Sequence, residues 1–192
     1  MQKIILASNS TYRRELLSKL RLDFVCIGSD VDESPLPGET AENLATRLAI
    51  AKAQALSTRH LNHLIIGSDQ VVICHDQFLG KPGNFAKAVQ QLEIQSGQAV
   101  LFYTGICVLN TSNGQYLTDL DCCTVHFRNL TARQIERYLT IEQPFDCAGS
   151  FKSEGYGITL IKQISGDDPN TLIGLPLIKL INLLGQFGLT IP

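Results

Sequence analysis

The sequence predicts an α/β fold in which a mixed, twisted sheet is flanked by helices. Apolar segments of strand length alternate with amphipathic segments of helix length along the chain. Two strand-like segments in the middle, at 100–109 and 116–127, are separated by Thr111-Ser-Asn-Gly114, which is typical of a β-hairpin. Because strands joined by a hairpin run antiparallel, the sheet cannot be purely parallel. We expect a ligand to bind in a cleft near the strand ends.

The N-terminal segment combines a buried strand with a helix start suited to an anion. Residues 4–6 form a short apolar strand, and Ser8 and Ser10 can cap the helix that follows, to about residue 21. The free N–H groups and the positive dipole end of that helix attract anions, and Arg13 and Arg14 add positive charge. An ordinary strand–helix turn with solvated arginines is the alternative.

The remaining elements follow from the same patterns. Thr40 caps a long helix whose apolar stripe leaves Arg47 and Lys52 outside. That stripe is expected at Leu44, Leu48, Ala51 and Ala55. The expected elements after residue 21 are a strand at 24–27, an acidic proline-rich loop at 28–39, a helix at 41–56, a strand at 64–73, a helix at 85–94, the hairpin strands at 100–109 and 116–127, a helix at 132–140, a loop at 146–157, a strand at 158–164 and a helix at 176–187.

Length and composition favour one domain, 1–192, built as one compact body or as two lobes. Sixteen basic residues against eighteen acidic ones give a net charge of −2, so no global field draws the protein to nucleic acid or to a membrane. The six cysteines form no C-x-x-C pair, which disfavours a zinc or redox motif. The apolar N-terminal run is too short for a secretion signal, so we expect a cytoplasmic protein.

Asp69 is the first candidate for a catalytic or metal-binding residue. It interrupts an apolar strand, and a carboxylate in such surroundings needs a metal, a cation or a raised pKa to be tolerated. A structural aspartate bonded to backbone amides or to a lysine is the alternative. Asp32 and Glu33 alone indicate solvated loop charges, but one of them together with Asp69 can hold a divalent cation such as Mg²⁺.

Lys52 and Lys81 join Arg13 as candidate phosphate partners, with solvated surface lysines as the alternative. Gly80-Lys81-Pro82 is not a Walker loop, and neither a Gly-x-Ser-x-Gly elbow nor a Gly-x-Gly-x-x-Gly fingerprint occurs. The four histidines lack metal-binding spacing. These basic and acidic groups are consistent with a nucleoside triphosphate and a bound metal, because phosphoryl chemistry requires charge neutralisation and an oriented water.

Seven ordered blocks resemble the Maf-like nucleotide pyrophosphatases along essentially the whole chain. The blocks are Leu6-Ala-Ser-x-Ser with Arg13-Arg14-x-Leu-Leu, Asp32-Glu33, Arg47-Leu-Ala-x-x-Lys52-Ala, Gly67-Ser-Asp69, Gly80-Lys81-Pro82, Ala148-Gly149 and Gly174-Leu-Pro176. The resemblance implies an α/β sheet with a deep cleft between two lobes, similar to the inosine triphosphatases. It also implies hydrolysis of nucleoside triphosphates between the α and β phosphates with a divalent cation, Mg²⁺ or Mn²⁺. One departure is Thr11, where proline is usual.

The resemblance implies roles for particular residues. Asp69 matches the proton acceptor, and Asp69 with Glu33 matches the metal-binding pair. The other residues that match phosphate and metal handling are Ser8, Arg13, Lys52 and Lys81. A small-molecule nucleotide is therefore the expected partner, and the apolar C-terminal helix can close the core or pair two subunits as a homodimer.

Three positions resemble the branch of the family that acts on 7-methyl-GTP: Tyr12, Gln70 and Glu154. Methylation at N7 makes guanine cationic, so its stacking on Tyr12 would gain cation–π energy. Glu154 can accept hydrogen bonds from N1–H and the exocyclic amine of that base, which uracil and thymine cannot offer in this pattern. Gln70 would contact the base edge. A partly buried surface aromatic and a loop charge are the alternatives for Tyr12 and Glu154.

Two other functions stay open from the sequence. One is a pyrophosphatase for other modified or pyrimidine triphosphates, such as dTTP or UTP. The other is a non-catalytic nucleotide-binding regulator of septum formation, a role in cell division arrest that is also attached to members of the family. The retained Asp69, Lys52 and Lys81 favour an enzyme over a pure binder.

Overall fold

The computed structural model describes residues 2–192, and among them a mixed sheet of seven strands is flanked by helices, which confirms the predicted fold class. The strand order is β2-β1-β3-β5-β6-β7, and β4 pairs with β3 outside that path. The strands are β1 (Lys3–Leu6), β2 (Phe24–Cys26), β3 (His63–Cys74), β4 (Gln77–Phe78), β5 (Ala99–Asn110), β6 (Tyr116–Phe127) and β7 (Ile161–Ser165). β1 is parallel to β2 and to β3, whereas β4 on β3 and β7 on β6 are antiparallel.

The chain forms two compact units. Unit 1 comprises residues 2–70, 103–121 and 168–192, and unit 2 comprises residues 71–102 and 122–167. The strands β3, β5 and β6 contribute residues to both units.

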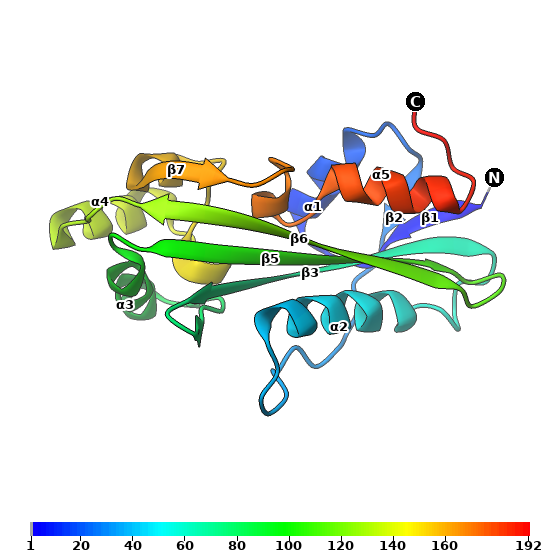
Figure 1. The fold of residues 1–192 in the computed structure, drawn as a ribbon, viewed down its shortest axis with the longest axis horizontal. Helices are drawn as coiled ribbons and strands as arrows, with labels where there is room; N and C mark the ends of the chain where they lie inside the picture. Colours follow the sequence, from blue (N-terminus) through cyan, green and yellow to red (C-terminus); the bar gives the residue numbers. More distant parts are fainter. Residues whose placement is uncertain (1) are drawn as a thin grey trace. The chain divides into compact units, whose positions relative to one another are not determined.

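Unit 1 has helices on both faces of its sheet. Figure 1 shows α1 (Thr11–Ser18) and α5 (Leu177–Gln186) over one face and α2 (Ala41–Gln54) over the other. One apolar cluster joins α1 and α5 to the strands: Ile4, Leu6, Leu16, Leu17, Leu64, Ile66, Ile106, Val108, Leu180 and Leu184 are among its members. A second cluster joins α2 to the opposite face through Ile5, Ala7, Ala49, Ala53, Ile65 and Cys107.

β1 is the point at which the direction of winding changes. The chain leaves β1 through α1 to reach β2 on one side, and it returns from β2 through α2 to β3 on the other side. In open α/β sheets, ligands bind outside the carboxyl ends of the strands at such a switch point. Here the residues that follow the paired Leu6 and Ile66 begin at Ala7 and Gly67. Ser8, which follows β1, and Asp69, in the part of β3 beyond its pairing with β1, therefore lie at the expected place for a ligand.

Two glycines allow α2 to pack very close to the sheet. A Cβ atom at Gly67 would lie 2.0 Å from the carbonyl oxygen of Ala49, and one at Gly105 would lie 2.4 Å from that of Ala45. Both oxygens belong to the helix backbone, which cannot move aside as a side chain can. Glycine at these positions of β3 and β5 therefore sets the distance between α2 and the sheet, in which β3 carries Asp69.

Unit 2 packs two helices around an aromatic core. These helices are α3 (Phe85–Gln95), capped by Asn84, and α4 (Ala132–Glu142), capped by Thr131 in a capping box with Gln134. Phe151 contacts Phe102 and Phe127, with ring centroids 6.0 and 5.1 Å apart. A short 3₁₀ helix at Ala148–Ser150 and another at Tyr156–Leu160 complete the unit.

The prediction for the apolar stripe of α2 was wrong by part of a turn. The buried residues are Ala41, Leu44, Ala45, Leu48, Ala49, Lys52 and Ala53. Ala55 is exposed and Ala51 half-buried, whereas Lys52, expected outside the stripe, is buried. The physical reason is that the alanines, rather than the larger leucines alone, face the glycines of the sheet, which rotates Lys52 inward.

The strand predicted at 158–164 begins later, at Ile161. Residues 156–160 wind into a 3₁₀ helix instead, and Ile158 is 54% exposed. Glu142 accepts a hydrogen bond from the backbone N–H of Tyr156 at 2.6 Å, and a Cβ at Gly157 would lie 2.4 Å from the oxygen of Lys152. These contacts fold the chain back before the strand starts.

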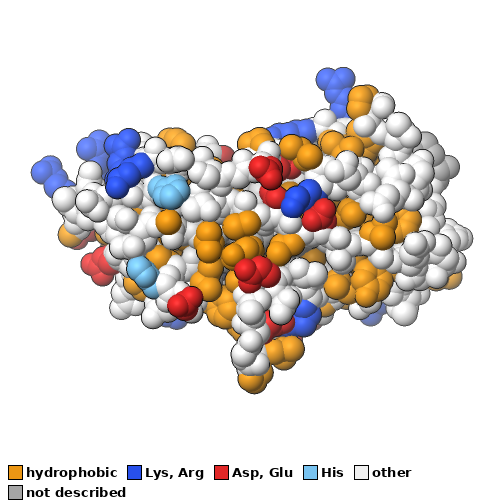
Figure 2. Space-filling model, viewed as in Figure 1, with side chains coloured by type: hydrophobic (Ala, Val, Ile, Leu, Met, Phe, Trp, Pro, Cys, Tyr) orange, Lys and Arg blue, Asp and Glu red, His pale blue; other side chains and the backbone are white. Residues whose placement is uncertain are grey.

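The apolar face of α5 closes the core of unit 1. Leu177, Leu180 and Leu184 are buried in the cluster with α1. Within residues 2–192 no helix is long and apolar enough to cross a membrane. Figure 2 shows Lys and Arg side chains gathered over α4 and β7, where Arg133, Arg137 and Lys162 are exposed. Composition had not indicated this local concentration of positive charge.

Replacing Gly67 by alanine tests the close approach of α2. We expect Gly67→Ala to lower the free energy of unfolding by about 1–3 kcal/mol, because the new methyl group overlaps the backbone of α2. Gly185→Ala is the matched control, because it adds the same methyl group in α5 with no heavy atom within 4 Å and is expected to be neutral or stabilising. Urea unfolding of both variants measures the difference, and equal stabilities would contradict the packing argument.

Candidate functional site

A buried ammonium group lies between two carboxylates in unit 1. Lys52 Nζ is 2.5 Å from Asp69 Oδ1 and 2.5 Å from Glu33 Oε1. The side chains of Lys52 and Asp69 are only 8% and 10% exposed, whereas that of Glu33 is 54% exposed. Asp69 Oδ1 and Glu33 Oε1 are therefore separated by no more than the sum of these two 2.5 Å contacts. The pair lies at the edge between core and solvent.

The alternation of side chains along β3 places Asp69 against α2. Ile65 and Gly67 face α2, so Asp69, two residues on, faces the same helix and meets Lys52. Ile66 faces the cluster with α1, and Ser68 follows it on that side. The pairing of Asp69 with Lys52 is thus the consequence of strand register and of the close approach of α2.

Arg13 is held from the other side by the loop before α5. Its Nε donates to the carbonyl oxygen of Gly174 at 2.9 Å, and Ser68 Oγ donates to the same oxygen at 3.0 Å. Gly174 has φ +114°, a conformation that L-residues rarely adopt, and so it presents this carbonyl to both donors. Burial lowers the pKa of Arg13, while the negative charges of Asp69 and Glu33 act in the opposite direction. The guanidinium group therefore lies within electrostatic reach of both carboxylates and stays charged at neutral pH.

Ser8 and Ser10 order the start of α1 as the sequence predicts. Ser8 is buried and its Oγ accepts from Ser10 N at 3.1 Å. Ser10 is the N-cap, and its Oγ accepts from Arg13 N at 3.3 Å. Tyr12, in the first turn, is half-buried. These contacts fix the N-terminus of α1 beside the end of β1.

Gln70 is anchored by its amide nitrogen. Nε2 donates to Thr104 Oγ1 at 3.1 Å and to the carbonyl oxygens of Thr171 and Leu172 at 2.9 and 3.1 Å. The amide oxygen is consequently the part of Gln70 that can contact a ligand. This arrangement narrows the predicted role of Gln70 to that of a hydrogen-bond acceptor.

The loop that holds Arg13 and Gln70 is itself braced by buried acidic residues. Asp121 accepts a hydrogen bond from Thr171 Oγ1 and forms an ion pair with Lys179 at 2.9 Å. Asp168 accepts from the backbone N–H of Asn170 at 2.8 Å and of Ile178 at 2.7 Å. Sequence reasoning did not single out these aspartates, although each is a carboxylate beside an apolar segment.

Two predicted site residues belong to unit 2. Lys81 is exposed in the loop between β4 and α3, where Gly149 N and Gln91 Nε2 donate to the carbonyl oxygen of the preceding Gly80. Glu154 is exposed, and its Oε2 accepts from Ser153 Oγ at 3.2 Å. The structure therefore brings together Glu33, Lys52 and Asp69 in unit 1, whereas Lys81 and Glu154 lie on separate loops of unit 2.

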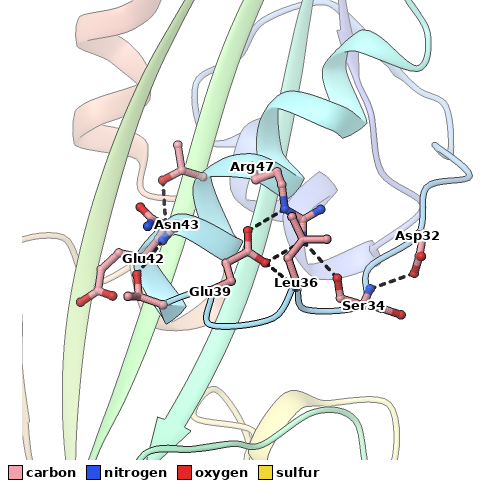
Figure 3. A network of polar contacts seen from close by, with 9 residues as sticks. Asp32, Ser34, Leu36, Glu39, Glu42, Asn43 and Arg47 are labelled. Atoms are coloured by element: carbon pink, nitrogen blue, oxygen red, sulfur yellow. Dashed lines mark hydrogen bonds and ion pairs between the residues drawn. The ribbon is translucent and has the colours of Figure 1, made fainter.

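The loop that carries Glu33 has its own polar network, which sequence reasoning missed (Figure 3). Arg47 Nε and Nη2 donate to the two oxygens of Glu39 at 2.6 and 2.8 Å, and Nη2 also donates to Ser34 O at 3.0 Å. Arg47 lowers the pKa of Glu39 to about 2, so the carboxylate is ionised throughout the neutral range. An acidic residue just before the N-cap of α2 and an arginine two turns into the helix were the available signals.

No group of three or more His, Cys, Asp or Glu side chains suited to a metal ion occurs in the described part of the chain. The pair Glu33 and Asp69 is a smaller set of hard oxygen donors. Mg²⁺ is commonly bound by one or two carboxylates, with water and substrate phosphate oxygens completing its coordination. The donor types thus fit a cation that is bound together with a phosphorylated ligand.

Sequence comparison places this arrangement in a family. The family model described as Maf-like protein matches residues 3–187. The chain belongs to the Maf-like family. Its curated relatives include proteins named 7-methyl-GTP pyrophosphatase from Pseudomonas syringae pv. syringae (strain B728a), 50% identical over 192 residues and the full length of both chains, and from Nitrosococcus oceani, 52% identical over 185 residues, 96% of this chain and 93% of the relative. A third, from Colwellia psychrerythraea, is 49% identical over 191 residues.

A solved structure of a nucleoside-triphosphatase from Mycobacterium abscessus covers 67% of this chain and 75% of its own, with 14% identity and a TM-score of 0.42. At that level of likeness it has no bearing on the site of this Maf-like protein.

A double-mutant cycle tests the buried ion pair of this Maf-like protein. Lys52→Met leaves the carboxylate of Asp69 without its cation, so we expect about 3–5 kcal/mol of lost stability. Asp69→Asn in the same chain removes the uncompensated charge. The free energy of unfolding that the double variant loses should therefore be about 1–3 kcal/mol smaller than the sum of the losses in the two single variants. Urea unfolding of the four proteins measures the coupling, and strictly additive losses would contradict the ion pair.

Proposed function

We propose that this Maf-like protein hydrolyses 7-methyl-GTP to 7-methyl-GMP and diphosphate and so removes a modified nucleotide from the pool. The observation that carries the proposal is the contact of Lys52 with both Asp69 and Glu33 within electrostatic reach of Arg13, where β1 ends beside the middle of β3. Relatives that match the full chain at about half identity and carry the name 7-methyl-GTP pyrophosphatase support the choice of substrate.

The proposed reaction is attack of a water molecule on the α phosphorus. The new bond joins the water oxygen to the α phosphorus, the bond from that phosphorus to the bridging oxygen of the β phosphate breaks, and diphosphate leaves. Asp69 accepts the proton of the water. Because Asp69 Oδ1 is already bonded to Lys52, Oδ2 is the oxygen that takes the proton. Lys52 keeps the carboxylate oriented until then.

Cations of the protein stabilise the charge on the leaving diphosphate. An ammonium group has three hydrogens, and Lys52 directs two of them at Asp69 and Glu33, so one is available for a phosphate oxygen. Arg13 uses Nε for Gly174, which leaves its two Nη groups for phosphate. Ser8 and the N–H groups at the start of α1 bind a further phosphate oxygen, and Lys81 of unit 2 completes the set.

A divalent cation, Mg²⁺ or Mn²⁺, would be held by Glu33 and Asp69, with phosphate oxygens as further ligands. When bound, it supplies charge neutralisation at the polyphosphate. Asp69 and Glu33 are both positioned for this by Lys52 before any cation binds.

The base is recognised by three residues in this proposal. Tyr12, half-buried in the first turn of α1, offers a ring face on which the cationic 7-methylguanine stacks. The carbonyl oxygen of Gln70 accepts from the base edge, because its amide nitrogen is bound to Thr171 and Leu172. Glu154 accepts from N1–H and the exocyclic amine.

We further propose that the protein acts on free nucleotides in the cytoplasm rather than on nucleic acid. The net charge of −2 supports this, since most nucleic-acid-binding surfaces depend on a large excess of positive charge. A homodimer remains part of the proposal, although Leu177, Leu180, Leu183 and Leu184 of α5 are buried within unit 1 and so do not support pairing of subunits.

A substrate panel tests the proposed activity. With Mg²⁺ present, we expect 7-methyl-GTP to give 7-methyl-GMP and diphosphate. Its kcat/KM should be at least tenfold above those for GTP, dTTP and UTP, because only the methylated guanine carries a positive charge that can interact with Tyr12 and Glu154. A chelator should abolish turnover. Asp69→Asn should reduce kcat by about 10²–10⁴-fold, since it removes the proton acceptor, while a cooperative thermal transition shows that the fold survives.

Higher efficiency on dTTP or UTP than on 7-methyl-GTP would favour a pyrimidine triphosphate pyrophosphatase instead. Binding of 7-methyl-GTP without release of diphosphate, with or without metal, would favour a nucleotide-binding regulator of septum formation.

Glu154→Gln tests base recognition separately from catalysis. The amide keeps the shape of the side chain but loses its charge and one acceptor, so kcat/KM for 7-methyl-GTP should fall by about tenfold or more. The value for UTP should change less than threefold. Steady-state kinetics on both substrates check the prediction, and an equal loss on both would place Glu154 outside base recognition.

A further inference from the structure

The loop between β2 and α2 carries Glu33 and contains no helix or strand. Residues 32–38 are exposed and contain two prolines and one glycine. At its start Ser29 Oγ donates to Ala7 O at 3.3 Å, and at its end Thr40 caps α2. The ion pair of Glu33 with Lys52 is therefore not enforced by burial of the loop, and something else must hold Glu33 in place.

Arg47 of α2 provides the main attachment of this loop (Figure 3). Its guanidinium group binds both oxygens of Glu39 and also the carbonyl oxygen of Ser34, the residue next to Glu33. Glu39 Oε2 in turn accepts from Leu36 N at 2.9 Å, and Glu39 N donates to Leu36 O at 3.0 Å. We refer to Arg47 and Glu39 as the latch.

The latch fixes the loop close to Lys52 on the same helix. Lys52 follows Arg47 by five residues, about 7.5 Å along the helix axis. Pinning the carbonyl of Ser34 to Arg47 therefore sets where the neighbouring Glu33 can reach, and its carboxylate meets Lys52 at 2.5 Å. The acidic residue Asp32 assists, because its Oδ1 accepts from Ser34 N at 2.9 Å.

We propose that Arg47 and Glu39 are positioning residues that hold Glu33 against Lys52 and Asp69, so that the two carboxylates are prepared for a divalent cation. This rests on the proposed function in assigning Glu33 and Asp69 to the metal. Neither Arg47 nor Glu39 contacts substrate in this proposal. They act through the backbone of residues 34–36.

The geometry of the latch distinguishes it from an ordinary surface ion pair. A single exposed pair contributes little, because solvent screens it and two flexible side chains must be ordered. Here the planar guanidinium binds a carboxylate through two parallel bonds and a backbone carbonyl through a third, and the side chain of Glu39 is only 8% exposed. A lysine at position 47 would keep the positive charge but could not make this forked contact.

Hydrogen exchange and metal binding test the latch directly. In Arg47→Lys we expect the amides of Ser34 and Leu36 to exchange about tenfold faster and the Kd for Mn²⁺, measured by electron paramagnetic resonance, to rise about tenfold. Glu39→Gln should behave alike. Arg59→Lys is the matched control: it is the same change at an exposed position after α2, and both measurements should equal those of wild type.

A second set of variants separates positioning from a general effect of the fold. In a Glu33→Gln background, Arg47→Lys should cause no further loss of Mn²⁺ affinity, because the residue it positions no longer carries a charge. In the single variant Arg47→Lys, which retains Glu33, kcat for 7-methyl-GTP at saturating Mn²⁺ should be within about twofold of wild type, while the half-activating Mn²⁺ concentration rises.

Unchanged exchange at Ser34 and Leu36 in Arg47→Lys would overturn the proposal, and so would a loss of Mn²⁺ affinity that persists in full in the Glu33→Gln background. Failure of wild type to hydrolyse 7-methyl-GTP would overturn the proposed function instead, and the exchange and Mn²⁺ measurements would still decide the role of the latch.

Discussion

The site depends on one ammonium group that is buried between two carboxylates. Burying Lys52 or Asp69 alone would leave a charge without compensation, at a cost of several kcal/mol. Each therefore requires the other, and their contact ties α2 to β3. Glu33 extends the pair toward solvent, and Arg13 adds a second positive charge within reach of both carboxylates. Two anionic and two cationic side chains thus gather where β1 ends beside the middle of β3, and a metal and a polyphosphate can each find partners of opposite charge there.

The backbone around this ion pair is arranged to make it possible. Gly67 lets α2 approach closely enough for Lys52 to reach Asp69, and Gly174 turns a carbonyl oxygen toward Arg13 and Ser68. Neither glycine takes part in the chemistry. They set how close α2 lies to β3 and where the carbonyl oxygen of residue 174 points. The site therefore depends on these two glycines as well as on its charged side chains.

Much of the fold could be predicted from hydrophobic periodicity and from caps. The central strand through Asp69, the hairpin at 111–114 and the helices capped by Thr40 and Thr131 are all present. The burial of Lys52 could not be predicted, because a lysine between alanines gives no signal of which face it shares until the glycine positions on the neighbouring strand are known. The Arg47–Glu39 latch was missed for a related reason: a bidentate contact depends on how an irregular loop folds back, which spacing along the chain does not encode.

The most direct test of this account is a crystal structure of wild type with Mn²⁺ and a non-hydrolysable 7-methyl-GTP analogue, with anomalous data collected at the manganese edge. The account predicts an anomalous peak in contact with carboxylate oxygens of Asp69 and Glu33 and with phosphate oxygens, while Lys52 stays within hydrogen-bonding distance of Asp69. A peak bound to other residues, or an Asp69 side chain turned away from the polyphosphate, would contradict it.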